Sequence, residues 1–428
     1  MSADPAGPRP LNPFAALMLR WGRMHPYNAV HLVRLPGSAD PAGLAAAAEA
    51  ELPAFGLGEL AADEPTLTFR RTGGPSAPEV RLFAPGADPA GWAGDELNRP
   101  FPEGPHVPVR LAVFPEPAAG THVLGLAYEH WVADGFVIGR LLARLIARLH
   151  GGDAPPAPAP DGPGYWDLFP GERDPVRIVW RLIEIFRLLG RLRWCYRGES
   201  GAALRDLGVA AAFAEPPAGM LDGLRPAARR RGATIHDLLV AAAAEAVAAH
   251  TPKRKWRSRR KDLAVGNVVD LRPAAGPAAA GAAGLYLGHF TVVCRGCHLD
   301  EFERLLRSVS VQTGHAKAER TYLRSLTDLT FSNLVWPWVR PENRARHFRD
   351  RAPLAAGISN LRMTHAGRVL SYRRAVPTGP TMPLSISPTT AAGRLTIGFT
   401  WRKAVFSEDR IGGVIASLLN RLSRLAGG

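Results

Sequence analysis

The sequence has little cysteine, little lysine and no long apolar run. Three cysteines among 428 residues exclude a disulfide-stabilised scaffold, because so few bridges could not hold a chain of this size. No segment has the roughly 18 consecutive uncharged apolar residues that a membrane-spanning helix needs, so we predict no such helix. The first residues lack a basic region followed by an apolar stretch. We therefore expect no secretory signal and a cytoplasmic location with reduced thiols.

Acidic residues are also few in comparison with basic ones. The chain has 53 Lys and Arg residues against 38 Asp and Glu residues, which gives a net charge of +15. Only five of the basic residues are lysines, so part of the excess reflects an arginine-rich composition. The charge favours anionic partners in general: phosphates, acidic proteins or an anionic membrane surface. A hydrophobic fraction of 46% with 21% charged residues is typical of a globular protein and excludes general disorder.

Hydrophobic periodicity predicts alternating strands and helices in the first part of the chain. The expected strands are residues 28–35, 107–114 and 122–128, with helices over 41–52 and 136–149. A Pro- and Gly-rich linker follows over 151–164, and a long helix is expected over 175–196.

The second part of the chain has the same alternation. The expected helices are 234–249, 299–311 and 409–425, and the expected strands are 263–269, 290–294, 357–363, 369–373, 384–388 and 395–401. Both parts together indicate an α/β protein with mixed sheets. We divide it into an N-terminal lobe (1–165), a crossover (166–199) and a C-terminal lobe (200–428).

A histidine stands directly after the predicted strand 122–128. His130 begins the segment HWVADG, residues 130–135, and the predicted helix 136–149 follows. A histidine at a strand end is held by the sheet and can face a cleft, and its ordinary pKa near 6.5 suits a general base. The alternative is a buried histidine beside an Asp-Gly turn, since so short a pattern also occurs by chance.

Further segments accompany this pattern along the chain. They are LNRPF (97–101), VPVRL (107–111), GATIHDLL (232–239), NVVDLRP (267–273), LGHF (287–290), ISNL (358–361) and the predicted strand 395–401. Their order resembles the chloramphenicol acetyltransferase superfamily, with nonribosomal-peptide condensation domains, plant BAHD acyltransferases and bacterial wax ester synthases. The resemblance covers about residues 26–425.

The resemblance implies two chloramphenicol-acetyltransferase-like lobes with an active-site cleft or tunnel between them. His130 would be the general base that deprotonates an alcohol or amine as it attacks a thioester. Asp134 would be structural and pair with Arg272 across the lobes, and Gly135 would permit a tight exit into the following helix. The implied substrate-binding residues are Trp131, Ser359 and Asn360, the last two near the thioester donor.

The implied reaction moves an acyl group directly from a thioester of CoA or of an acyl-carrier protein to a hydroxyl, and we expect a lipophilic acceptor. No acyl-enzyme, no tightly bound cofactor and no metal are expected. Condensation domains and wax ester synthases usually have two adjacent histidines, whereas Glu129 replaces the first one here. BAHD enzymes and chloramphenicol acetyltransferase use the second alone, but the BAHD Asp-Phe-Gly-Trp-Gly motif is missing.

Two alternatives to this acyltransferase follow from the same resemblance. A freestanding condensation enzyme would form an amide, and we expect a freestanding protein because no carrier-protein segment is appended. A catalytically inactive condensation-like scaffold is the second alternative, and the replacement by Glu129 is compatible with it. A nucleic-acid-binding protein is a third interpretation that rests on charge alone, and we expect no nucleic acid partner.

Two basic segments point to a further partner. In the predicted helix 177–194, arginines recur on one face and apolar residues form a broad surface, which is typical of a helix on a membrane surface. The alternative is a helix packed over its own domain with its arginines in solvent. The basic segment 251–261 could meet CoA phosphates or an acidic carrier protein, or be a solvated loop.

One cysteine-containing segment matches the pattern of c-type haem attachment. Cys294 and Cys297 stand in the sequence CRGCH, residues 294–298. Haem attachment requires export, and no second C-x-x-C completes a zinc site, so we expect neither haem nor metal. His236, His289 and His365 show no ligand spacing and are expected to be ordinary surface or core residues.

Overall fold

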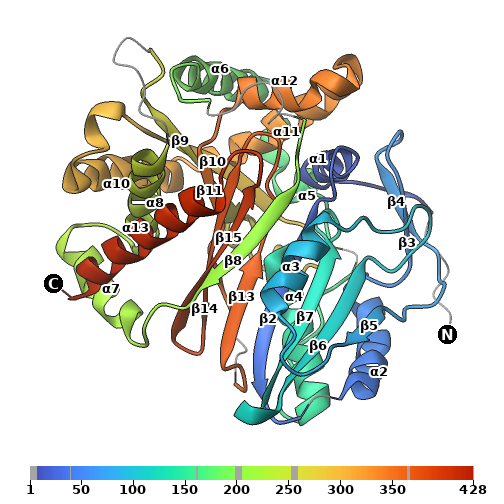
Figure 1. The fold of residues 1–428 in the computed structure, drawn as a ribbon. Coiled ribbons are helices and arrows are strands. Elements are labelled where there is room, and N and C mark those ends of the chain that lie inside the picture. Colours follow the sequence, from blue (N-terminus) through green and yellow to red (C-terminus); the bar gives the residue numbers. More distant parts are fainter. Residues whose placement is uncertain are drawn as a thin grey trace.

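Two mixed β-sheets, each covered by helices, form the two lobes of the molecule (Figure 1). The computed structural model describes residues 7–38, 40–160, 162–197, 205–251, 259–363 and 367–427. Most of the basic segment 251–261 and His365 lie outside these described residues. The architecture confirms the predicted mixed α/β fold of two lobes.

The five-stranded sheet of the first lobe has the strand order β13-β2-β7-β6-β5. Its central strands are apolar on both faces because α2 (Pro41–Glu51) and α4 (Gly135–His150) cover one face and α3 (Pro89–Asn98) covers the other. The strands are β2 (Asn28–Pro36), β5 (Glu79–Leu82), β6 (Val109–Glu116), β7 (Thr121–Glu129) and β13 (Ser371–Ala375).

The larger sheet of the second lobe has the order β10-β9-β11-β14-β15-β8, with β12 beside β14. Its core helix α8 (Ile235–His250) begins at a capping box made by Thr234 and Asp237 and is buried along most of its length. Its many alanines let α10 (Phe302–Ala318) and α13 (Glu408–Gly427) pack closely against it. The strands are β8 (Val209–Ala214), β9 (Leu263–Asp270), β10 (Leu287–Cys294), β11 (Ala356–Ile358), β12 (Leu361–Arg362), β14 (Leu384–Ala391) and β15 (Arg394–Arg402).

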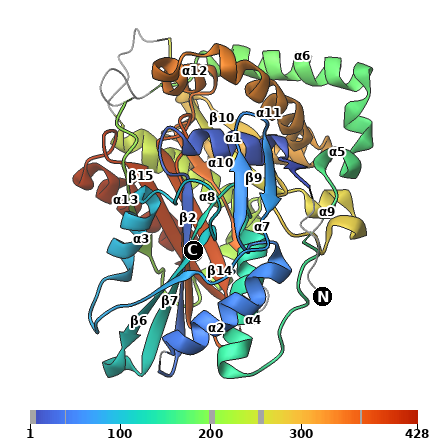
Figure 2. The ribbon, with the colours of Figure 1, turned by 90° about the vertical axis from the view of Figure 1, so that its right-hand side faces the viewer.

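A third group of elements joins the two lobes. α1 (Pro13–Gly22) packs against α11 (Arg324–Val335), and their buried side chains form an apolar cluster with Trp131 and Tyr286. Figure 2 shows α6 and α12 along the upper edge of the molecule, with α11 beneath them. The remaining elements are β1 (Arg9–Pro10), β3 (Leu60–Asp63), β4 (Thr68–Arg71), α5 (Tyr165–Leu168), α6 (Pro175–Leu192), α7 (Met220–Arg230), α9 (Arg272–Ala275) and α12 (Arg344–Arg351).

The lobes do not follow the order of the chain as the division at residues 165 and 200 assumes. β13 comes from the second part of the sequence but pairs with β2 in the sheet of the first lobe, from Ser371 opposite Arg34 to Ala375 opposite Val30. The predicted strand 357–363 is divided into β11 and β12 by a break at Ser359 and Asn360. These two departures place residues beside the site described below.

No single helix of the described residues is long and apolar enough to cross a membrane. α7 and α8 reach the required hydropathy only as a pair bent by 94°. α8 is the core helix of the second lobe, so its apolar composition is explained by burial within the protein.

Candidate active site

A cavity of about 380 Å³ lies between the two lobes. The first lobe contributes Tyr128, His130 and Asp134, and the second contributes residues of β9, β10 and the segment 357–362. Apolar side chains of α1, α11 and α12 form part of its wall, and these are Phe14, Leu17, Met18, Trp21, Leu329 and Phe348. The position between lobes and the apolar wall suit a site for organic substrates.

His130 lies at the exit of β7 and is 8% exposed. Its backbone N–H donates to the carbonyl of Tyr27 at 3.0 Å, and its Nδ1 lies 3.1 Å from the carbonyl oxygen of Ala133. Because a carbonyl can only accept, Nδ1 carries the proton and Nε2 is the unprotonated nitrogen. The rings of Tyr27 and Tyr128 flank the imidazole, with centroids at 6.2 and 5.6 Å.

The surroundings of His130 favour the neutral imidazole. Burial lowers the pKa of His130 below its ordinary value of 6.5, and the positive charge of Arg374 acts in the same direction. The carbonyl of Ala133 and the carboxylate of Asp134 oppose this shift without reversing it. A neutral imidazole with a free Nε2 can accept a proton at neutral pH.

Asp134 is fully buried and connects three segments. Its Oδ1 caps α4 by accepting from the N–H groups of Phe136 and Val137, both at 3.1 Å. Its Oδ2 accepts from Nη1 of Arg272 at 2.8 Å and from the N–H of Tyr286 at 2.9 Å. The carboxylate therefore fixes the loop that carries His130 to the second lobe.

Arg272 is 3% exposed and has its donors satisfied on several sides. Besides Asp134, Nη1 donates to Asp270 at 3.1 Å, Nη2 to the carbonyl of Gly284 at 3.0 Å and Nε to the carbonyl of Ala282 at 3.3 Å. Its guanidinium also lies over the ring of Phe136 at 4.6 Å. The structure thus brings Asp134 and Arg272 together as a buried pair between the lobes.

The structure gives a different reason for a glycine at position 135 than the tight exit into the helix that the sequence predicted. Its backbone is helical and lies outside the left-handed region. A Cβ at this position would lie 3.0 Å from Nη1 of Arg374 and 3.3 Å from a methyl carbon of Leu361. The glycine therefore provides room for the side chains of Arg374 and Leu361 rather than for an unusual turn.

Ser359 and Asn360 line the cavity at the break between β11 and β12. The N–H of Ser359 donates to the carbonyl of Ile386 at 3.0 Å, and its own carbonyl accepts from Nη2 of Arg374 at 2.5 Å. Both side chains therefore belong to a backbone turn that is fixed from two sides.

Trp131 does not line the cavity, in contrast to its expected role in substrate binding. It is 6% exposed and packs in the apolar cluster between the lobes, with its ring 6.2 Å from that of Phe69. The turn that directs His130 into the cavity directs the next side chain into this core. We therefore withdraw the assignment of Trp131 as a substrate-binding residue.

Glu129, which replaces the first of two adjacent histidines, also lies away from the cavity. Its carboxylate is 2.8 Å from Nε2 of His106. Burial alone would lower the pKa of His106, but the hydrogen bond and the charge of Glu129 outweigh it and raise that pKa. Glu129 is therefore engaged in an ion pair on the outer side of the loop.

Arg374 is a site residue that sequence reasoning missed. It lines the cavity and is 2% exposed, and its guanidinium donates to neutral groups: the hydroxyl of Thr389 at 3.0 Å and the carbonyls of Ser359 and Pro388. Burial lowers its pKa, which shows the cost of holding the cation there. The predicted strand 369–373 ended one residue before Arg374, whereas β13 extends to Ala375, so its alternation places Arg373 and Arg374 on opposite faces.

His289 also lines the cavity, although it was expected to be an ordinary residue. Its Nε2 lies 3.8 Å from Asp328 of α11, which in turn pairs with Arg351 of α12 at 2.6 Å. His236 hydrogen-bonds Asn267 at 3.0 Å, and only Asn267 lines the cavity. Nothing in the local spacing of these residues indicates their shared location, because the contacts join distant parts of the chain.

No protein-family model and no curated protein matches the sequence. Solved structures nevertheless share the fold over almost the whole chain. The first condensation domain of the calcium-dependent antibiotic synthetase has a TM-score of 0.71 and 18% identity, over 99% of this chain and 97% of that domain. The condensation domain of the monacolin K polyketide synthase has a TM-score of 0.65 and 13% identity, over 100% and 99%.

A third similar structure is the X-domain from teicoplanin biosynthesis, solved as a complex with OxyB. It has a TM-score of 0.60 and 17% identity, over 99% of this chain and 94% of that chain. The fold is therefore that of condensation domains, and the predicted likeness to condensation domains is confirmed at the level of the fold.

Proposed function

We propose that the protein is an acyltransferase that moves an acyl group from a thioester to a hydroxyl acceptor, with His130 as the general base. The hydrogen bond between Nδ1 of His130 and the carbonyl of Ala133 is the observation that carries this proposal. It supports a basic Nε2 in a cavity that residues of both lobes line.

In the proposed reaction, Nε2 of His130 takes the proton of the acceptor hydroxyl as the oxygen attacks the thioester carbonyl carbon. The carbon–sulfur bond then breaks, and the protonated imidazole returns the proton to the departing thiolate. Holding both substrates in one cavity supplies much of the acceleration by proximity, and the base adds typically about 10²–10⁴-fold.

Ser359 and Asn360 are the proposed hydrogen-bond donors to the thioester oxygen, which gains negative charge in the transition state. Arg374 acts as a positioning residue, because its guanidinium holds the carbonyl of Ser359 and so fixes the turn. Asp134 and Arg272 have the same positioning role for the loop of His130.

The substrate classes follow from the wall of the cavity and from charge. The apolar side chains from α1, α11 and α12 support a lipophilic acceptor. The net charge of +15 supports a donor that carries phosphate or other negative charge, either CoA or an acyl-carrier protein.

Thiol release is the test of this proposal. Acyl-CoAs of graded chain length, and then acyl-carrier thioesters, are offered with a pool of alcohols and amines. We expect acceptor-dependent thiol release that falls about 10²–10⁴-fold in His130→Ala. His298→Ala, at a partly exposed histidine outside the cavity lining, is the matched control and keeps full activity. Equal release by wild type and His130→Ala would contradict the role of His130.

The products of that assay decide between ester and amide formation. An amide product from the amine acceptors would favour a condensation enzyme instead. The X-domain complex gives a reason to keep a docking protein as a second candidate, because that neighbour was solved with a protein partner. Release from neither CoA nor carrier thioesters would favour this second candidate.

A further inference from the structure

Exposed apolar side chains gather along one edge of the molecule. Eleven large apolar side chains are exposed among the described residues, and eight of them lie on α6, α11 and the residues just after these helices. We call this set the upper apolar surface: Val176, Val179, Trp180, Phe186, Trp194, Phe331, Leu334 and Trp338. Figure 2 shows α6 and α11 on the same upper side, and the two helices pack against each other.

α6 buries an arginine and exposes large aromatic side chains, the reverse of what is usual for a helix on a protein surface. Its buried side chains are Arg181, Ile185 and Leu192, while Trp180 and Phe186 are 55% and 66% exposed. Arg181 is 2% exposed and is held by Glu172, with bonds of 2.8 and 2.9 Å. A polar pair thus attaches the helix to the protein, and the large apolar side chains remain in contact with solvent.

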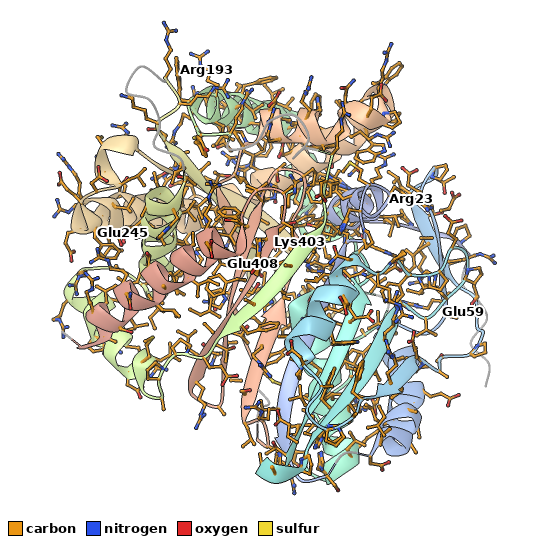
Figure 3. All side chains as sticks on the ribbon, viewed as in Figure 1. Arg23, Glu59, Arg193, Glu245, Lys403 and Glu408 are labelled. Carbon is orange, nitrogen blue, oxygen red and sulfur yellow. The ribbon has the colours of Figure 1, made fainter. Side chains whose placement is uncertain are left out.

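Positive charge accompanies the upper apolar surface. Arg177, Arg187, Arg191 and Arg193 are exposed, and the single acidic residue of α6, Glu184, is already paired with Arg181 at 2.9 Å. Figure 3 shows Arg193 beside α6 at the upper edge. Arg191 also lines a hollow with three more arginines and no carboxylate, the arginines being Arg295, Arg304 and Arg307.

α11 connects the upper apolar surface with the cavity between the lobes. Phe331 and Leu334 point to solvent, whereas Asp328, Leu329 and Ser332 of the same helix line the cavity. The upper apolar surface and the cavity therefore lie on opposite sides of one helix, α11.

We propose that the upper apolar surface binds peripherally to the surface of an anionic lipid bilayer. Exposed Trp, Phe and Val side chains would enter the boundary between headgroups and acyl chains, and the arginines would contact lipid phosphates. The mixture favours a bilayer over a second copy of this chain, because exposed arginines of the same sign would face each other in a symmetric dimer. This binding is independent of the proposed reaction. Delivery of a lipophilic acceptor from the bilayer to the cavity along α11 is a consequence that rests on the proposed function.

Co-sedimentation of the full chain with vesicles tests the proposal. One set of vesicles is phosphatidylcholine alone, and the other contains phosphatidylcholine with phosphatidylglycerol. We expect binding to the anionic vesicles that weakens as salt is added. Trp180→Ala/Phe186→Ala should lower the partition coefficient about tenfold or more. Leu82→Ala/Leu370→Ala, at exposed apolar residues outside the upper apolar surface, is the matched control and should bind like wild type.

A charge-matched pair of variants isolates the electrostatic part. Arg187→Gln/Arg191→Gln should weaken binding to anionic vesicles, and Arg229→Gln/Arg230→Gln on α7 should not, although both lose two charges. The proposal is overturned if the chain binds neither type of vesicle, or if the α6 variants bind like wild type. It is also overturned if light scattering without lipid shows that the upper apolar surface mediates self-association. Because binding is the readout, these outcomes do not depend on whether thiol release is found.

Discussion

At the scale of single residues, the protonation state of His130 determines when the proposed base can act. Its pKa lies below 6.5 because the ring is buried and Arg374 is near. The base works only when it is neutral, so kcat/KM should be constant above pH 6.5 and fall as pH decreases through the lowered pKa, finally about tenfold per pH unit. A pH profile of thiol release measures this, with circular dichroism showing that the fold is intact. A midpoint above 6.5 would contradict the assignment.

The buried pair of Asp134 and Arg272 has a measurable share in stability. Asp134→Asn keeps an acceptor for the cap of α4 but removes the negative charge 2.8 Å from Arg272. Loss of one partner from a buried pair typically lowers the free energy of unfolding by roughly 3–5 kcal/mol. We expect the lower end of this range, about 3 kcal/mol, because Asp270 also contacts Arg272. Urea denaturation measures the change. Asp222→Asn, at an exposed pair with Arg225, is the control and should cost less than about 1 kcal/mol. Equal losses would contradict a special role for the buried pair.

The site residues differ in how far the sequence indicated them. His130 and Asp134 are close in sequence, so one local segment indicated both. Arg272 was predicted from the family resemblance. Arg374 and His289 reach the cavity from β13 and β10, and only the pairing of distant strands brings them there. Trp131 was misplaced because the direction of a side chain in a turn depends on dihedral angles that residue types do not give.

At the scale of elements, the packing of α3 on the first sheet depends on Gly125 in β7. A Cβ at Gly125 would lie 2.5 Å from the ring of Trp92. Gly125→Ala should therefore lower the free energy of unfolding by about 1–3 kcal/mol through overpacking. Thermal unfolding checks this. Gly190→Ala, on α6 where no atom lies within 4 Å of such a Cβ, should be neutral or slightly stabilising. A destabilisation at Gly125 that Trp92→Phe does not relieve would show that another contact is responsible.

Element prediction succeeded where the apolar pattern is regular. The expected strand 28–35 is β2, Asn28–Pro36, and the expected helix 136–149 is α4, Gly135–His150. The expected helix 175–196 ends earlier, at Leu192 in α6. Helices α1, α3, α7, α11 and α12 were not predicted.

At the scale of the whole molecule, β13 makes the two lobes depend on each other. Because it pairs with β2, the sheet of the first lobe is incomplete without the second part of the chain, and because it contacts β14 and β15, that sheet also packs against the sheet of the second lobe. We expect β7 and β15 to lose hydrogen-exchange protection at the same urea concentration, in one cooperative transition. Exchange measured by mass spectrometry tests this, and α6, which buries only Arg181, Ile185 and Leu192, should lose protection earlier. Loss in two separate steps would restore the simple division of the chain near residue 200.

The sequence by itself determined the α/β class, the order of most strands and helices, and the segment that places His130 before a capped helix. These features depend on hydrophobic period, capping residues and turns, which act between near neighbours in the chain. Only the tertiary structure decided that β13 crosses to the first lobe, that Arg374 and His289 line the cavity, and that α6 keeps its aromatic residues in solvent. Each of these depends on contacts between segments far apart in sequence. The local sequence does not indicate which distant residues bury or neutralise a given side chain.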